Sequence, residues 1–367
     1  MLSQRNEGTK NISIYNNNIY NKLLIITLFL SFLLSSFRNN NVYASGEAKD
    51  VTNGTITIGS ENIRYIGDGL ASTEIKDYNN RSIKLSQETL ETLFGENKRI
   101  LKFNYFIKDK AITDVSNLTN KNIFLTGENT RFQINTNISI GSYNPTNNSV
   151  FAMIGIDLTN DGILLYNYKT VSINTNYILF TGNRVYRESG DAFLFYNEGN
   201  CILDLNSDSI AITNNTFSSN YTFNSSDYDR YNKYSIIIKN QGILNINLHG
   251  NTPSFTLSNN KMTEGSNGKG VIGILNSSEV NFINNSNTEA KVILGHDIRD
   301  SGGSSTINFK NGTNYNGSFY IDLSTNMIEA NTLNIETNTT LLLTINGSEL
   351  IGNLKGVGTD PKLNISD

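Results

Sequence analysis

The sequence predicts an all-β protein built as a solenoid, a parallel β-helix with a short N-terminal cap of helix and strand. The first observation is that residues 162–296 contain four units of similar order. Each unit has a short apolar run that ends in Asn, then an alternating run, then a polar stretch rich in Asn and Ser. Successive units are spaced by about 30, 43 and 36 residues, within the range of stacked repeats.

The composition is the second observation. Only 17% of the residues are charged and 37% are hydrophobic, a balance that is also compatible with disorder. The Ile, Leu, Phe and Tyr residues, however, form short alternating runs that can each bury one face. In the clearest run, Leu244, Ile246 and Leu248 alternate with Asn245 and Asn247, as a strand that lines a solenoid core should.

The Asn that ends each apolar run is the third observation. These marker residues are Asn167, Asn197, Asn240 and Asn276. At a corner between strands Asn tolerates the left-handed backbone conformation best after Gly, and stacked Asn side chains can also form an amide ladder. We therefore expect the four residues on successive coils at the ~4.8 Å strand spacing. Codon usage rich in A and T is the alternative reason for so much Asn.

The first 44 residues have the order of a secretory signal peptide. Arg5, Lys10 and Lys22 precede the apolar residues 23–37, and small residues before position 45 predict cleavage after Ala44. A membrane anchor is the alternative, but about 15 apolar residues are fewer than the roughly 20 that span a bilayer. The sequence thus predicts export.

Three further segments follow the signal peptide. Residues 45–120 form the predicted cap, with a hairpin or first strand turn over 51–58 and an amphipathic helix over 86–94 that covers the end of the core. The helix could instead contact a partner. Residues 121–350 are the predicted repeats, and residues 351–367 are a C-terminal tail.

Short motifs in the repeats resemble the passenger regions of autotransporter and polymorphic outer-membrane proteins of Gram-negative bacteria. Phe180-Thr-Gly-Asn183 and Phe217-Ser-Ser-Asn220 match the F-x-x-N tetrapeptide, and Leu257-Ser-Asn-Asn260 is related. Strand starts of the type seen at Asn240–Ile246 and Asn331–Ile335 also carry the resemblance, which covers roughly residues 120–350. It implies a right-handed parallel β-helix at the cell surface, often in adhesion.

The chain departs from that family in two ways. The Gly-Gly-Ala motif is absent, since Gly302-Gly303 is followed by Ser304. The translocating β-barrel of the family does not fit after residue 350. We therefore expect any outer-membrane anchor to be supplied in trans, and the chain to be a truncated relative, a passenger fragment or a separately secreted solenoid.

Residues that could perform catalysis are sparse. Gly295–Asp300 is the densest candidate, with His296, Asp297, Arg299 and Asp300, but alternation would place these side chains on opposite sides of a strand. A loop ion pair between Arg299 and Asp297 or Asp300 is the simpler interpretation. A carbohydrate-active enzyme is the alternative, and it would gain if the fold brought two acids and Arg299 together in a lateral groove.

Three other candidates are interpreted as structural. Residues 157–162 offer oxygen ligands but lack the spacing of a calcium loop, so a polar turn is expected. His249 is expected to be exposed at a turn. Cys201, the single cysteine, is expected to be a small buried residue rather than a reactive thiol. The sequence predicts no catalytic residue, no metal and no cofactor.

An aromatic segment is the candidate binding loop. Residues 221–234 interrupt the units at their longest point, and long insertions in repeat proteins often lie on one functional face. The candidate binding residues are Tyr221, Phe223, Tyr228, Tyr231 and Tyr234. A surface insertion without a role is the alternative.

The expected function is that of an exported protein, at the cell surface or outer membrane or secreted, with an adhesive or structural role and no catalytic step. Expected partners are a surface glycan or a host or cell-surface protein. The net charge of −4 argues against nucleic acid, for which a basic patch is the usual signature. A self-assembling surface-layer scaffold is a further alternative.

Overall fold

The structure is a computed structural model. It describes short strand segments between Lys49 and Lys108 and residues 111–366, apart from 147–148, 160–161, 188–191, 220–233, 264–269, 324–325 and 345–346. The predicted signal peptide and the predicted helix over 86–94 lie outside the described residues.

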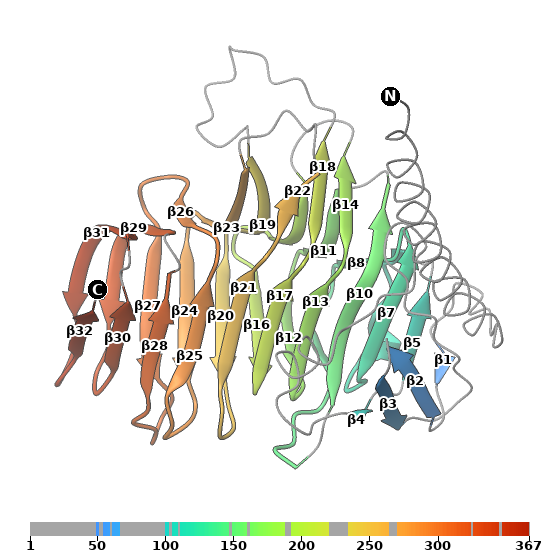
Figure 1. Ribbon diagram of the computed structural model, residues 1–367, viewed down its shortest axis with the longest axis horizontal. Coiled ribbons are helices and arrows are strands. Elements are labelled where there is room, and N and C mark those ends of the chain that lie inside the picture. The colour runs from blue at the N-terminus through green and yellow to red at the C-terminus, as the bar shows by residue number, and fades with distance from the viewer. Residues whose placement is uncertain are drawn as a thin grey trace, which may run out of the picture. The chain divides into compact units, whose positions relative to one another are not determined.

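The described residues form a parallel β-helix, as predicted, whose strands lie side by side along the long axis (Figure 1). A sheet of 14 strands makes the first face of each coil. Its main path is β1 (Lys49–Asp50), β5 (Tyr105–Lys108), β7 (Ile123–Glu128), β10 (Val150–Leu158), β13 (Tyr177–Thr181), β17 (Ser209–Thr213), β21 (Ser254–Ser258), β25 (Ala290–Leu294), β28 (Ser318–Asp322), β30 (Thr340–Thr344) and β32 (Lys362–Ser366). Beside this path lie β14 (Arg184–Arg187), β18 (Thr216–Ser219) and β22 (Lys261–Met262).

A sheet of 15 strands makes the other two faces. The second face holds β6 (Ala111–Ile112), β8 (Arg131–Ile134), β11 (Ile163–Asn167), β15 (Phe193–Asn197), β19 (Tyr234–Asn240), β23 (Gly270–Asn276) and β26 (Ile298–Asp300). The third face holds β9 (Ile138–Ile140), β12 (Thr170–Asn174), β16 (Ile202–Ser207), β20 (Ile243–Leu248), β24 (Glu279–Asn284) and β27 (Thr306–Asn311). Two long strands, β29 (Met327–Ile335) and β31 (Glu349–Gly356), run through both faces.

A smaller sheet lies earlier in the chain. Strand β2 (Gly54–Ile58) pairs antiparallel with β3 (Glu61–Ile66), and β3 pairs parallel with β4 (Ile100–Lys102). Residues 54–58 of the predicted hairpin or strand turn are thus one strand, which pairs with the strand that follows it. The one short helix of the described residues is a 3₁₀ turn, η1 (Ser116–Leu118).

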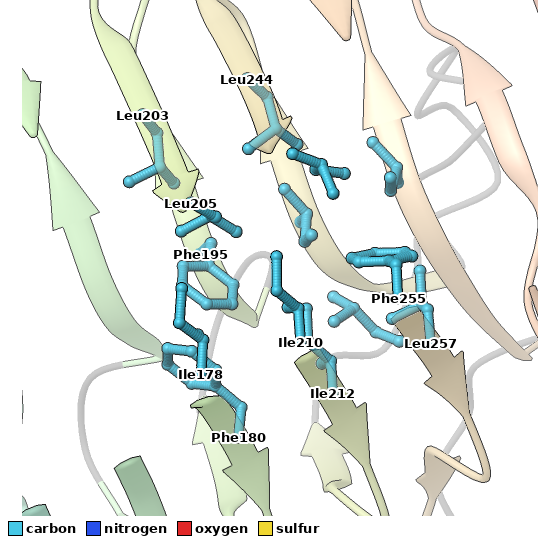
Figure 2. Packing of buried hydrophobic residues seen from close by; sticks show 14 of the residues in the cluster. Ile178, Phe180, Phe195, Leu203, Leu205, Ile210, Ile212, Leu244, Phe255 and Leu257 are labelled. Carbon is cyan, nitrogen blue, oxygen red and sulfur yellow. The ribbon is translucent and has the colours of Figure 1, made fainter. Parts of the chain in front are cut away.

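Apolar side chains on alternating positions fill the interior, and Figure 2 shows those of neighbouring coils in contact. Leu203, Leu205 and Leu244 are fully buried, as the alternation predicts. Phe rings continue the core along the axis: Phe282 stacks on Phe309 with ring centroids 5.0 Å apart and meets Phe255 edge-on at 5.7 Å. Such ring pairs add to the free energy of burial.

Coil length varies while register is kept. Hydrogen-bonded neighbours on adjacent coils are 43 residues apart at Asn197 and Asn240 but only 22 apart at Thr344 and Ser366. The strands at both places are nevertheless paired in parallel register. The core therefore does not depend on how long each coil is.

The structure corrects the predicted limits of the repeats. Parallel pairing begins with β5 pairing with β7, before residue 121, and continues past residue 350 to β31 and β32. Residues 351–367 are thus not a tail, because Leu363 continues the apolar position of Leu341 on the coil before it. The right-handed sense of the coil stays a prediction.

Candidate binding surface

The four marker asparagines form an inner amide ladder. Asn167, Asn197, Asn240 and Asn276 lie in register on β11, β15, β19 and β23, and all four are fully buried. Each Nδ2 donates to the Oδ1 of the next residue, at 2.8, 2.8 and 2.9 Å. The same amides donate to backbone carbonyls of the next coil, such as Ile202 O at 3.0 Å. These hydrogen bonds hold neighbouring coils in register.

The expected left-handed conformation falls on other residues. Asn214 and Asn259 have φ angles of 56°, and Gly182 has a φ of 65°. Each of these precedes a member of a second inner ladder, which runs from Asn183 to Asn260. The marker asparagines themselves end strands and have no positive φ, and the chain bends directly after Asn167, Asn240 and Asn276.

The second inner ladder corrects the alignment of the F-x-x-N motifs. Asn183 Nδ2 donates to Asn215 Oδ1 at 2.9 Å, and Asn215 Nδ2 donates to Asn260 Oδ1 at 2.8 Å. The middle member belongs to Ile-Thr-Asn-Asn, because Phe217 pairs instead with Val185 on β14. The ladder ends at His296, as described below, and Asn220 lies outside the described residues.

His296 ends the second ladder by accepting the Asn260 backbone N–H at its Nε2, 3.0 Å away. A ring nitrogen that accepts must be unprotonated, so the imidazole is neutral here. Burial lowers the pKa of His296 below its ordinary value, and the nearby Asp297 carboxylate works in the opposite direction. His296 thus has a structural partner.

An outer row on the second face is the best candidate for binding. Parallel pairing places Tyr166, Tyr196, Lys239, Leu275 and Arg299 opposite one another on β11, β15, β19, β23 and β26. Glu329 occupies the next position, because Ile298 pairs with Ile328. We call these six residues the outer row; one end is aromatic and the other is charged.

Tyrosine rings gather at the aromatic end. The Tyr166 ring stacks on Tyr168 with centroids 3.9 Å apart and meets Tyr196 edge-on at 4.6 Å. Phe193 stacks on Tyr196 at 5.7 Å, and the Lys239 ammonium lies 5.2 Å from the Phe193 centroid and 5.6 Å from that of Tyr196. These contacts fix the rings in place, so a ligand would meet a preformed apolar surface.

Polar groups border these rings. The Tyr196 hydroxyl donates to Gln241 Oε1 at 2.5 Å. Partial burial raises the pKa of Tyr196, and the negative charge of Glu198 raises it further, to a smaller extent. Partial burial is also the main cause that raises the pKa of Tyr166. Both phenols therefore stay neutral and can donate or accept hydrogen bonds at any physiological pH.

The charged end is an ion-pair cluster. Arg299 Nη2 lies 2.7 Å from Asp297 Oδ2, and Arg299 Nη1 lies 3.7 Å from Glu329 Oε2. Asp297 Oδ1 also accepts the Met327 backbone N–H at 2.9 Å. The pairing of Asp297 with Arg299 agrees with the sequence-based interpretation. The sequence did not predict Glu329 at this place. Its carboxylate is the second acid beside Arg299 that a carbohydrate-active enzyme would require.

The predicted binding loop can be placed only at its last residue. Tyr234 is half-buried at the start of β19 and packs against an apolar cluster of Phe193, Ile236, Ile272 and Leu275 outside the main core. Tyr221, Phe223, Tyr228 and Tyr231 lie outside the described residues.

Sequence reasoning missed Tyr166, Phe193 and Tyr196, although a signal existed. An aromatic residue stands directly before the marker Asn in two successive units, Leu-Tyr-Asn and Phe-Tyr-Asn.

The remaining candidates have structural contacts. His249 is not exposed at a turn, because its ring packs on Tyr143 with centroids 4.9 Å apart and burial lowers its pKa. Asp157 lies in β10 rather than in a turn, 8% exposed and 3.8 Å from Arg184 Nη1. Cys201 is buried as expected, and burial raises the pKa of its thiol.

Among the described residues, no group of three or more His, Cys, Asp and Glu side chains could hold a metal ion. The same part of the chain contains no helix long and apolar enough to cross a membrane. No protein-family model, curated protein or solved structure matches the sequence.

Proposed function

We propose that the chain is an exported β-helix that binds a glycan along the outer row, in an adhesive role at the cell surface. The observation that carries the proposal is the alignment of the aromatic end with the charged end in one register row. Tyr196 and Arg299 lie three strand spacings apart, about 14 Å. An extended oligosaccharide could contact both ends at once.

The chemistry of the row suits a sugar. A sugar ring has an apolar C–H face, which packs on an aromatic ring, and a rim of hydroxyls, which need donors and acceptors. The Tyr166 and Tyr196 rings supply the aromatic surface. Gln241, Lys239 and Glu198 lie near these rings and supply the hydrogen-bond donors and acceptors. Arg299 with its carboxylate partners adds charge at the far end.

Export and display rest on the sequence. The basic, apolar and small-residue order of residues 1–44 supports secretion, and the resemblance to autotransporter passenger regions supports display at the surface. A membrane anchor supplied in trans belongs to the same proposal.

A glycan array probed with the full chain tests the binding proposal. Tyr196→Ala and Tyr166→Ala should each weaken binding to the best glycan by about tenfold or more, because each removes a stacking ring. Tyr320→Ala is the matched control, since this half-buried Tyr lies on β28 of the first face. Binding that is absent, or that falls equally in the control, would refute the proposal.

A second candidate function, cleavage of a polysaccharide, is favoured by one observation: Asp297 and Glu329 both meet Arg299. Two carboxylates are the usual requirement for glycoside hydrolysis. Both acids are engaged by one guanidinium, so we place binding first. Incubation of the full chain with a bound glycan, followed by a reducing-end assay, tests this candidate. Release of new ends that Glu329→Gln abolishes would establish cleavage, and no release would exclude it for that glycan.

A further inference from the structure

One row of polar residues crosses the third face in unbroken parallel register. Its members, from β16 to β31, are Asp204, Asn245, Asn281, Asn308, Asn334 and Lys355. We call them the Asp204–Lys355 row; it has an acid at one end, a base at the other and only amides between them. The row lies on the outer side of the face, because it alternates with core residues such as Leu203 and Leu205. Aligned side chains of this kind are typical of flat sheets, and a flat face can pack on a second flat face.

The charges of the row complement the same row in reverse order. If a second copy lies face to face with the first and its coils run in the opposite direction, β16 of one copy lies opposite β31 of the other. Asp204 then faces Lys355, twice by symmetry, and Asn245 faces Asn334. The two-fold axis lies between the faces, parallel to the strands, and crosses the row midway between β24 and β27. Such self-complementarity is the signature of a two-fold interface.

Residues on either side of the row fit the same arrangement. The axis lies between β24 and β27, so residues that are paired on these two strands face each other across the interface. Glu279 faces Thr306 of the other copy, whose hydroxyl can donate to the carboxylate. Ile283 faces Lys310, whose methylene groups can cover it while the ammonium stays in water. All four side chains are partly exposed, and no like charges meet at these positions.

Two other arrangements of the same faces are less favourable. If the coils of the two copies ran in the same direction about an axis along the row, Asp204 would face Asp204 and Lys355 would face Lys355. If the antiparallel axis crossed β24 itself, Asp204 would face Asn334, and Lys355 would face Ser172, which precedes Asp204 in register. Only the antiparallel arrangement about the midpoint therefore pairs both charges of the row.

The size of the face indicates how strong the contact is. The row crosses six strands, β16, β20, β24, β27, β29 and β31. At ~4.8 Å between strands and ~3.3 Å per residue over about five residues, the face measures roughly 29 by 17 Å, or about 500 Å² on each copy. A total of about 1,000 Å² is at the low end of specific interfaces. We therefore expect a reversible dimer with a dissociation constant in the micromolar range.

We propose that the third face joins two copies of the chain face to face, with antiparallel coils, about a two-fold axis between β24 and β27. The partner is a second copy because the charge pattern of this face complements itself. The outer row lies on the second face, so the inference does not depend on glycan binding there.

Sedimentation velocity of the full chain over a concentration series tests the proposal. The wild type should show a reversible monomer–dimer equilibrium. Asp204→Lys and Lys355→Glu should each raise the dimer dissociation constant by about tenfold, because two attractive pairs become repulsive. Ile283→Arg should raise it by about tenfold or more, since it places a cation opposite Lys310 at two places. Circular dichroism and urea unfolding establish that each variant is folded.

Mixing the two charge variants supplies the decisive readout. The Asp204→Lys variant carries a positive charge at both ends of the row, and the Lys355→Glu variant carries a negative charge at both ends. Each end of one variant then faces an opposite charge on the other, so the mixture should form a heterodimer with wild-type affinity.

The matched control is Lys291→Glu, the reversal of an exposed charge on β25 of the first face, which should leave the dimer unchanged. A wild-type chain that stays monomeric at every soluble concentration would overturn the proposal. A mixture that associates no more tightly than either variant alone, or a control that weakens the dimer as much as the third-face variants do, would overturn it as well.

Discussion

The inner amide ladder and a second, outer amide ladder use the same bond in two settings. On the third face, Asn334 Nδ2 donates to Asn308 Oδ1 at 2.8 Å, and Asn308 and Asn281 continue the chain of bonds through Asn245 to Asp204. The inner ladder has similar distances, 2.8 to 2.9 Å against 2.5 to 2.8 Å, but all of its amides are fully buried. Similar distances therefore do not mean similar contributions to stability, because Asn245 and Asn334 of the outer ladder are partly exposed and have water as an alternative partner, whereas no inner amide does.

The two ladders also run in opposite directions. Inner amides donate toward the C-terminal coils, whereas outer amides donate toward the N-terminal coils. The outer ladder therefore points its N–H end at Asp204, which also accepts the Ser172 hydroxyl at 3.0 Å. At its carbonyl end Asn334 pairs in register with Lys355. Aligned amide dipoles thus run from a cation to an anion, as in the last and first turns of a helix.

Replacing an inner amide by a carboxylate is the change with the largest expected effect. In Asn240→Asp, an oxygen would replace the Nδ2 that donates to Asn276 Oδ1, Gly242 O and Glu279 O. A buried charge facing three acceptors should lower the free energy of unfolding by about 4 kcal/mol or more at pH 7. Urea unfolding measures it.

The matched outer change is Asn334→Asp, which should cost less than about 1 kcal/mol because its position is partly solvated and in register with Lys355. Similar losses in the two variants would contradict the difference between the ladders.

Truncating one Asn to Ala should give a smaller difference in unfolding free energy between the two ladders. Asn240→Ala removes one link and leaves the amides of Asn197 and Asn276 buried without their partner, which should cost about 3 kcal/mol. Asn334→Ala exposes its partner to water and should cost about 0.5 to 1 kcal/mol. Urea midpoints at constant slope give both values. If the two alanine variants were equally stable, burial would not determine how much each amide hydrogen bond contributes to the free energy of unfolding.

Acid should destabilise the folded chain through His296, which ends the second inner ladder. The folded-state pKa of His296 lies below its ordinary value, so the unfolded chain takes up a proton that the folded chain resists. The free energy of unfolding should therefore fall as pH drops below about 6.5, by at most about 1.4 kcal/mol per pH unit. His296→Asn should lose this part of the pH dependence. Equal slopes for variant and wild type between pH 7 and 5.5 would show that folding does not lower the pKa of His296.

The end of the outer ladder should give the smallest effect. In Asp204→Asn one oxygen is retained for Asn245, and the Ser172 hydroxyl can turn to accept from the new amide. The expected loss is about 0.5 kcal/mol. A loss above about 2 kcal/mol, measured by urea unfolding, would mean that the aligned amides depend on a full charge at Asp204.

Local patterns predicted the fold well because they act within one strand. Alternation identified the core positions of Leu203 and Leu244, and the marker asparagines identified the ladder, since each requires only near neighbours in sequence. The outer row could not be predicted in the same way. That Tyr166, Lys239 and Arg299 lie in one row follows only from the length of every intervening coil. Because these lengths are irregular, the sequence does not reveal the register.

The ion-pair cluster was half predicted for the same reason. Asp297 and Arg299 are two residues apart, so their pairing is local, whereas Glu329 arrives from the next coil. His249 was misassigned because nothing near it in sequence announces Tyr143, which approaches from an earlier coil.

Strands β18 and β19 are each followed or preceded closely by an inner ladder, since Asn215 stands just before β18 and Asn240 ends β19. Added length between these two strands changes the closure entropy only slowly. Foreign sequence could therefore be grafted between Ser219 and Tyr234 while the rungs on either side keep their partners. The protein could in this sense serve as a carrier for a peptide epitope or a small domain.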